Sequence, residues 1–96
     1  MKRVIWSKTA RKELFAIAAY YSQFDPALPD TLLRRIEQGP LALLEYPGIG
    51  SPTARRGVRK WRVRDTPFLL FYAAQGDTIE IRRVRHVRSE APATTS

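Results

Sequence analysis

The stretch GVRKWRVRDTPFLLFYAAQGDTIEIRRVRHVR, residues 57–88, decides the fold because it holds three strand-like segments in a row. Its middle segment, residues 68–74, is apolar on both faces, which predicts the central strand of a sheet. The tight turn at residues 75–77 leads into the last segment, residues 78–86. The first segment, residues 58–64, alternates between an apolar side and a basic side. We therefore expect a three-stranded antiparallel sheet that carries positive charge.

The N-terminal part of the chain predicts a strand followed by a helix. Residues 2–6 form a short β-branched and aromatic run. Ser7 or Thr9 then offers a hydroxyl N-cap for a helix over residues 10–21, where apolar side chains recur every three or four residues. Pro26 marks the end of this helical region, because proline disfavours helical geometry in the residue before it.

A second helix should begin near residue 28 and bury the apolar side chains that recur at helical spacing. We expect Gly39 and Pro40 to interrupt it, because Pro40 cannot donate to the carbonyl of Ile36 and its ring would clash there. Pro40 then opens a further helical turn, and residues 46–53 are rich in turn-forming Pro and Gly. The two helices should form an antiparallel hairpin packed on the sheet, which gives an α+β fold.

Length and composition limit the classes of protein. The chain has 96 residues, 44% of them hydrophobic, which is enough for one core. We expect a single domain over residues 1–89 and a disordered tail over residues 90–96. Zero cysteines and one histidine, His86, exclude thiolate and multi-histidine metal sites, so no cofactor is expected. Neither a signal peptide nor an apolar run of the ~18 residues that span a membrane is present, so we expect a cytoplasmic protein without a membrane partner.

Positive charge is concentrated in the second half of the chain. The net charge is +8, and residues 51–96 hold ten basic against four acidic residues, whereas residues 1–50 hold seven against five. A basic surface attracts polyanions or acidic proteins over a long range. Many small domains are basic for solubility alone, and charge by itself favours neither interpretation.

The order of these patterns resembles the RelE/ParE superfamily of bacterial toxins from type II toxin–antitoxin pairs. The resemblance covers nearly the whole chain and implies a toxin domain that is neutralised by a cognate ParD-like antitoxin, which recruits operator DNA to the complex. Five short motifs carry it: VIWSKTARKEL (4–14), the helix exit IEQGPLALLEYPGIG (36–50), GVRKWRV (57–63), PFLLFY (67–72) and GDTIEIRRVRH (76–86).

Two activities occur in this superfamily, and one is a ribosome-dependent mRNA endoribonuclease of the RelE type. Such an enzyme needs a general base, a cation on the phosphate and an acid for the leaving oxygen. His86 and Arg59 could serve in it, although a lone histidine also fits a structural role at the rim of a sheet. Residues 47–57, where relatives place a catalytic Glu or Lys, offer only arginine, which cannot act as a base. Leu69 stands where relatives carry a phosphate-binding arginine.

The resemblance therefore implies the ParE branch, whose members inhibit DNA gyrase without catalytic residues of their own. A plain nucleic-acid-binding module is a third alternative, but the chain lacks the aromatic pattern of an RNA-recognition sheet. Trp61 also fits a core position, since large aromatics on the apolar side of a strand usually pack. We expect contact with gyrase or the antitoxin through the basic strands and two aromatics: Lys60, Arg62, Arg64, Arg82, Arg83, Arg85, Trp61 and Tyr72.

Overall fold

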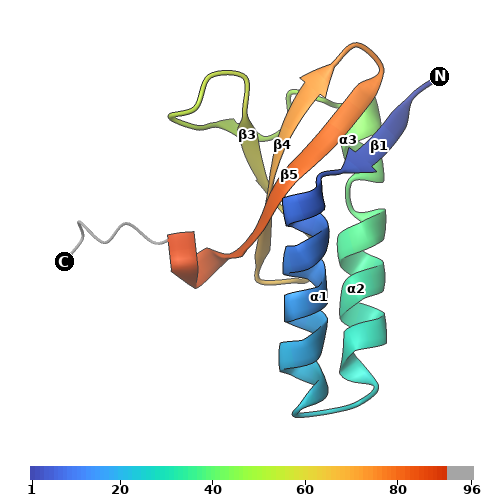
Figure 1. Cartoon of the computed structure of the whole chain (residues 1–96). Helices are drawn as coiled ribbons and strands as arrows, with labels where there is room; N and C mark the ends of the chain where they lie inside the picture. Colours follow the sequence, from blue (N-terminus) through green and yellow to red (C-terminus); the bar gives the residue numbers. More distant parts are fainter. Residues whose placement is uncertain (91–96) are drawn as a thin grey trace.

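A helical hairpin and a five-stranded sheet make up the fold (Figure 1). The computed structural model describes residues 1–90, so residues 91–96 of the predicted tail lie outside the described residues, and Glu90 ends a short 3₁₀ helix. The elements are β1 (Arg3–Trp6), α1 (Lys8–Ser22), α2 (Leu28–Gln38), α3 (Leu41–Glu45), β2 (Ser51–Pro52), β3 (Arg59–Arg62), β4 (Phe68–Gln75), β5 (Thr78–His86) and η1 (Val87–Glu90).

The sheet has the strand order β1-β5-β4-β3-β2, which confirms β4 as the central strand. β4 is antiparallel to both neighbours, and Gln75 pairs with Thr78 across a two-residue turn. Gly76 takes a φ of 58° in that turn, a conformation that glycine adopts without strain. The expected three-stranded antiparallel sheet is thus present, but two further strands extend it. The N-terminal strand β1 joins β5 in parallel, and the short β2 pairs with β3.

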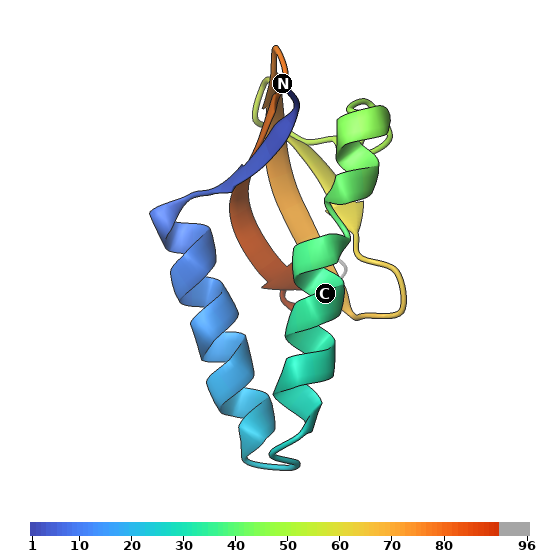
Figure 2. The same ribbon diagram turned by 90° about the vertical axis from the view of Figure 1, so that its right-hand side faces the viewer.

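The two main helices lie side by side and antiparallel, as expected, and the tip of their hairpin projects beyond the sheet (Figures 1 and 2). Ser7 is the N-cap of α1, because its Oγ accepts a hydrogen bond from the Ala10 N–H at 3.0 Å. The predicted interruption at Gly39 and Pro40 is confirmed. The Leu43 N–H bonds to the carbonyl of Pro40, only three residues back, at 2.9 Å, so α3 starts as a separate short helix.

One core lies between the helices and one face of the sheet. Ile36 and Leu43 come from the helical layer, and Leu70, Tyr72 and Ile81 come from the strands; all five are fully buried. Because side chains alternate along a strand, the residues between these buried positions point to the opposite face. Within residues 1–90, α1 and α2 pack on the other side of the sheet and leave this face uncovered (Figures 1 and 2). We call this opposite side the open face of the sheet.

Candidate functional site

A bulge in β5 turns two neighbouring arginines to the open face. Phe71 pairs with Arg83 but Tyr72 pairs with Ile81, so Arg82 is the extra residue on β5. Ile81 before the bulge and Val84 after it are both buried against the core. Arg82 and Arg83 therefore both point away from the core, although adjacent residues of a regular strand point to opposite faces.

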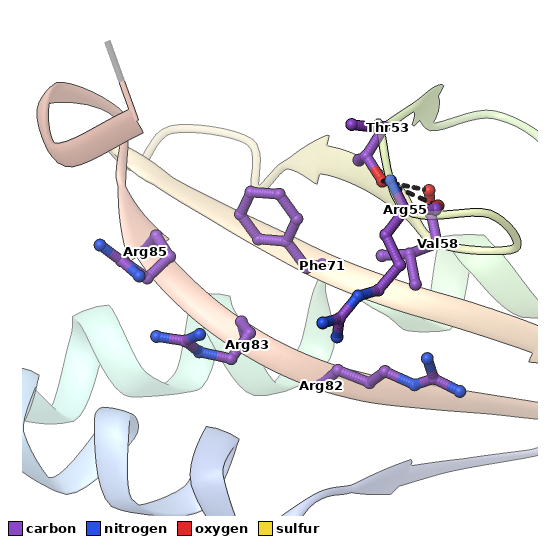
Figure 3. Close-up of a pocket in the computed structure, with 8 residues that line it drawn as sticks. Thr53, Arg55, Val58, Phe71, Arg82, Arg83 and Arg85 are labelled. Atoms are coloured by element: carbon purple, nitrogen blue, oxygen red, sulfur yellow. Dashed lines mark hydrogen bonds between the residues drawn. The ribbon is translucent and has the colours of Figure 1, made fainter. Parts of the chain in front are cut away.

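These arginines line a pocket of about 280 Å³ on the open face, together with a side chain from the loop before β3. Figure 3 shows Arg55 reaching from that loop towards β5, and Phe71 of β4 to one side of it, towards Arg85. Phe71 is half-buried and forms an apolar floor. The eight lining residues are Thr53, Ala54, Arg55, Val58, Phe71, Arg82, Arg83 and Arg85.

Two carboxylates hold the arginines of the bulge. Arg82 Nε donates to Glu80 Oε1 at 2.8 Å on the same strand. Arg83 donates through Nε and Nη2 to Glu13 of α1, at 3.1 and 2.9 Å to Oε2. Four arginines, Arg55, Arg82, Arg83 and Arg85, line the pocket, and Glu80 and Glu13 bind two of them. A surface of this kind binds phosphate or carboxylate groups.

The other predicted cations do not join this pocket. β4 lies between β3 and β5, so the two basic strands are not direct neighbours. Lys60 is exposed on the open face opposite Phe71 but does not line the pocket. Arg62 donates from Nε to the carbonyl of Thr66 at 2.9 Å and, with Trp61 and Arg64, lines a separate groove beside α2. Trp61 also packs against the core.

Tyr72 has a structural role, which corrects the expectation that it contacts a partner. Its side chain is fully buried. The hydroxyl donates to the carbonyl of Pro47 at 2.7 Å and accepts from the Gly50 N–H at 3.0 Å. Tyr72 therefore anchors the loop between α3 and β2, and its ring presents no surface to another molecule.

His86 lies on the helix side of the sheet, away from the arginine pocket. Its ring meets Phe68 edge to face, with the centroids 5.4 Å apart, and its Nδ1 accepts from the Arg88 N–H at 3.0 Å. Arg59 donates from Nη1 to the carbonyl of Gly50 at 2.7 Å. His86 pairs with Phe68, whereas Arg59 pairs with Tyr72, four residues further along β4. At roughly 3.3 Å per residue the two pairings are about 13 Å apart, so His86 and Arg59 do not converge on one phosphate.

The sequence interpretation missed Arg55 and Phe71 as site residues. Arginine cannot act as a general base, so a search of residues 47–57 for a base gives Arg55 no role, and Phe71 stands in a strand that is apolar on both faces. Their proximity to β5 depends on the path of the loop over the sheet, for which the sequence carries no local signal. Within residues 1–90, the structure contains no cluster of three or more metal-ligating side chains, and no helix there is long and apolar enough to cross a membrane.

Comparison with known proteins gives consistent matches along the chain. Residues 4–91 match the family model described as ParE toxin of type II toxin-antitoxin system, parDE. The chain is 32% identical over 91 residues to Y4kP of Sinorhizobium fredii, a protein named as a candidate toxin, and the match covers 95% of this chain and 94% of Y4kP. It is 31% identical over 86 residues to toxin RelE2 of Caulobacter vibrioides, covering 90% and 96% of the two chains.

Solved structures show the same architecture. A chain of the chromosomal ParDE toxin–antitoxin system of P. aeruginosa superposes with a TM-score of 0.79 at 25% identity, covering 90% of this chain and 96% of that chain. The isolated RelE toxin of E. coli gives a TM-score of 0.63 at 17% identity over the whole of both chains, a likeness of fold alone.

Proposed function

Because this chain belongs to the ParE family of toxins of type II toxin–antitoxin systems, we propose that it inhibits DNA gyrase and that a cognate antitoxin neutralises it. Gyrase is the proposed target because members of the ParE branch of the superfamily inhibit DNA gyrase. It would place the site of action in the cytoplasm, where the chromosome lies. A gyrase inhibitor of this kind needs a binding surface, and no residue of the toxin has to transfer a proton.

The separation of the ribonuclease residues is the observation that carries this proposal. His86 and Arg59 pair with positions four residues apart on β4, and both have partners within the fold. Residues 47–57 contain no Asp, Glu, His or Lys that could act as a general base. Leu69 is a half-buried aliphatic residue on the open face and cannot bind a phosphate. Acid, base and phosphate ligand are therefore not assembled in one place.

The antitoxin is proposed to use both charge and apolar contacts. Acidic residues of the antitoxin would pair with the arginines on the open face, which increases the association rate and the specificity. Phe15 on α1 is 74% exposed and lines a small hollow with Leu33 of α2, so it offers an apolar contact between the helices. An antitoxin that covers these surfaces would also bring operator DNA into the complex through its own DNA-binding domain.

Two assays with the purified chain test the target. In the first, gyrase supercoils relaxed plasmid in the presence of increasing toxin, with and without the antitoxin. In the second, ribosomes translating a defined mRNA are incubated with the same amounts of toxin. We expect loss of supercoiling that the antitoxin reverses, and intact mRNA. Cleaved mRNA together with unaffected supercoiling would contradict the proposal and would favour a RelE-like activity, as the similarity to toxin RelE2 suggests.

A further inference from the structure

The arginine pocket on the open face combines two features that a simple protein-binding surface does not need. It has an aromatic floor, Phe71, and cationic walls that come from two separate segments, β5 and the loop at residues 53–58. We propose that this pocket binds a free nucleoside phosphate, with the base on Phe71 and the phosphates on Arg55 and the β5 arginines. The inference does not depend on gyrase being the target.

The base would stack on Phe71. This ring is half-buried, so one part of it is supported by the sheet while another part faces the pocket. Its two cross-strand neighbours are Lys60 on β3 and Arg83 on β5, so cations flank the ring on both sides. Stacking of a base on an aromatic side chain is favourable for every base, and neighbouring cations add attraction for the phosphates that follow.

The phosphate would meet guanidinium groups that the fold already holds in place. Glu80 binds Arg82 and Glu13 binds Arg83, which restricts both side chains before a ligand arrives. Arginine presents a planar set of donors that matches two phosphate oxygens at once. Because these side chains are already ordered, less conformational entropy is lost when the ligand binds.

Arg55 completes the pocket from the opposite side, on a loop with its own hydrogen bonds. Thr53 Oγ1 accepts from the Arg55 N–H at 3.2 Å and donates to the carbonyl of Val58 at 2.8 Å. The Val58 N–H in turn donates to the carbonyl of Arg55 at 3.1 Å. These hydrogen bonds hold the backbone of the loop in place, and the Arg55 side chain extends from it towards β5 (Figure 3).

The size and limits of the pocket favour a small ligand over a nucleic-acid strand. Its volume of about 280 Å³ lies near the lower end of small-molecule sites, which start at roughly 300 Å³. Lys60 and Arg62, the cations that a longer strand would need on β3, do not line it. Thr53, Ala54, Arg55 and Val58, from the loop at residues 53–58, line the pocket on the side of β3.

Isothermal titration calorimetry of the purified chain tests the inference with four probes: ADP, adenosine, pyrophosphate and a single-stranded hexanucleotide. We expect ADP to bind with one site per chain, at least about tenfold more tightly than adenosine or pyrophosphate, because only ADP uses both the ring and the arginines. Arg55→Ala and Phe71→Leu should each weaken ADP binding about tenfold. Arg56→Ala is the matched control, because Arg56 is the next residue in the same loop and lies outside the pocket.

Several outcomes would overturn the inference. The first is the absence of ADP binding. The second is equal affinity for pyrophosphate and ADP, which would indicate a surface that binds anions in general. The third is binding of the hexanucleotide alone, which would indicate a surface for single-stranded nucleic acid. Equal weakening by Arg55→Ala and Arg56→Ala would also overturn it, since it would reflect net charge only. Unfolding midpoints of all variants are measured to ensure that they are folded. Because no gyrase is present, a negative result here leaves the proposed target untouched, and the reverse also holds.

Discussion

The carboxylate of Glu13 accepts a hydrogen bond from the backbone N–H of Val84 at 2.8 Å, at an edge of the sheet where β1 has already ended. β1 pairs with β5 only as far as Ile81, and Ser7 continues the edge by donating from Oγ to the carbonyl of Arg82 at 3.0 Å. Side chains from the start of α1 thus take the place of a neighbouring strand. The Glu13 carboxylate also binds Arg83 at the pocket, so Glu13 belongs both to the edge of the sheet and to the candidate site.

Glu13→Ala should therefore destabilise the protein by about 1–2 kcal/mol, because the Val84 N–H loses a charged acceptor. The ion pair with Arg83 adds little to this cost, since the side chain of Arg83 is 45% exposed and surface pairs contribute roughly 0–1 kcal/mol. Urea denaturation measures the change. Glu13→Gln keeps an acceptor oxygen and should lose less than half as much. Glu37→Ala, on the exposed side of α2, is the control, and a loss as large as that of Glu13→Ala would argue against the edge role.

Arg82→Glu should weaken binding of the antitoxin by about tenfold or more and make the remaining affinity less sensitive to salt, because a favourable charge contact becomes a repulsive one. The dissociation constant is measured at low and at physiological salt. Arg34→Glu, on the exposed side of α2, changes the net charge by the same amount and should have a much smaller effect. Equal effects of the two variants would show that only net charge matters.

His86→Ala should leave toxicity largely intact, because His86 packs on Phe68 at the helix side of the sheet and does not meet Arg59 at a common phosphate. Were His86 the acid or base of an RNA cleavage, its removal would slow that reaction by about 10²-fold or more. Growth after induction is recorded beside mRNA integrity and supercoiling. A folded His86→Ala protein that loses both toxicity and mRNA cleavage would favour the ribonuclease, and His86→Gln tests whether a polar side chain suffices.

Tyr72→Phe should lower the free energy of unfolding by about 1–3 kcal/mol, because both Pro47 and Gly50 lose their hydrogen-bond partner in a buried position. The affinity for the antitoxin should change little, since the ring is not at the surface. Denaturation and antitoxin titration measure the two effects. Tyr46→Phe removes a hydroxyl from a side chain that is 65% exposed and serves as the control. A Tyr72→Phe protein that is as stable as the parent but binds the antitoxin poorly would show that Tyr72 contacts the antitoxin after all.

Local chemistry in the sequence was sufficient to predict the main helices and four of the five strands. It did not predict β2, which lies in the segment expected to be a turn. An apolar run over residues 68–74 between turn signals predicted β4. Pro40 predicted the break between α2 and α3, because proline lacks the N–H that a continuous helix needs, whatever the rest of the chain does. The family resemblance rests on the same kind of signal, since its motifs are short and occur in a fixed order. The sequence also predicted that positive charge would gather on the strands.

The tertiary structure alone decided which of those charges act together. The alternation of side chains along a strand predicts that the sheet has two faces, but it does not say which face packs against the helices. For this reason the sequence interpretation placed Tyr72 at the interface with a partner, although the structure buries it fully. The bulge on β5 then changes the alternation at Arg82, and the path of the loop at residues 53–58 brings Arg55 to the same pocket. The pairing of β1 and β2 with the other strands, the bulge position and the loop path depend on contacts between residues far apart in the chain. A local pattern carries no information about such contacts.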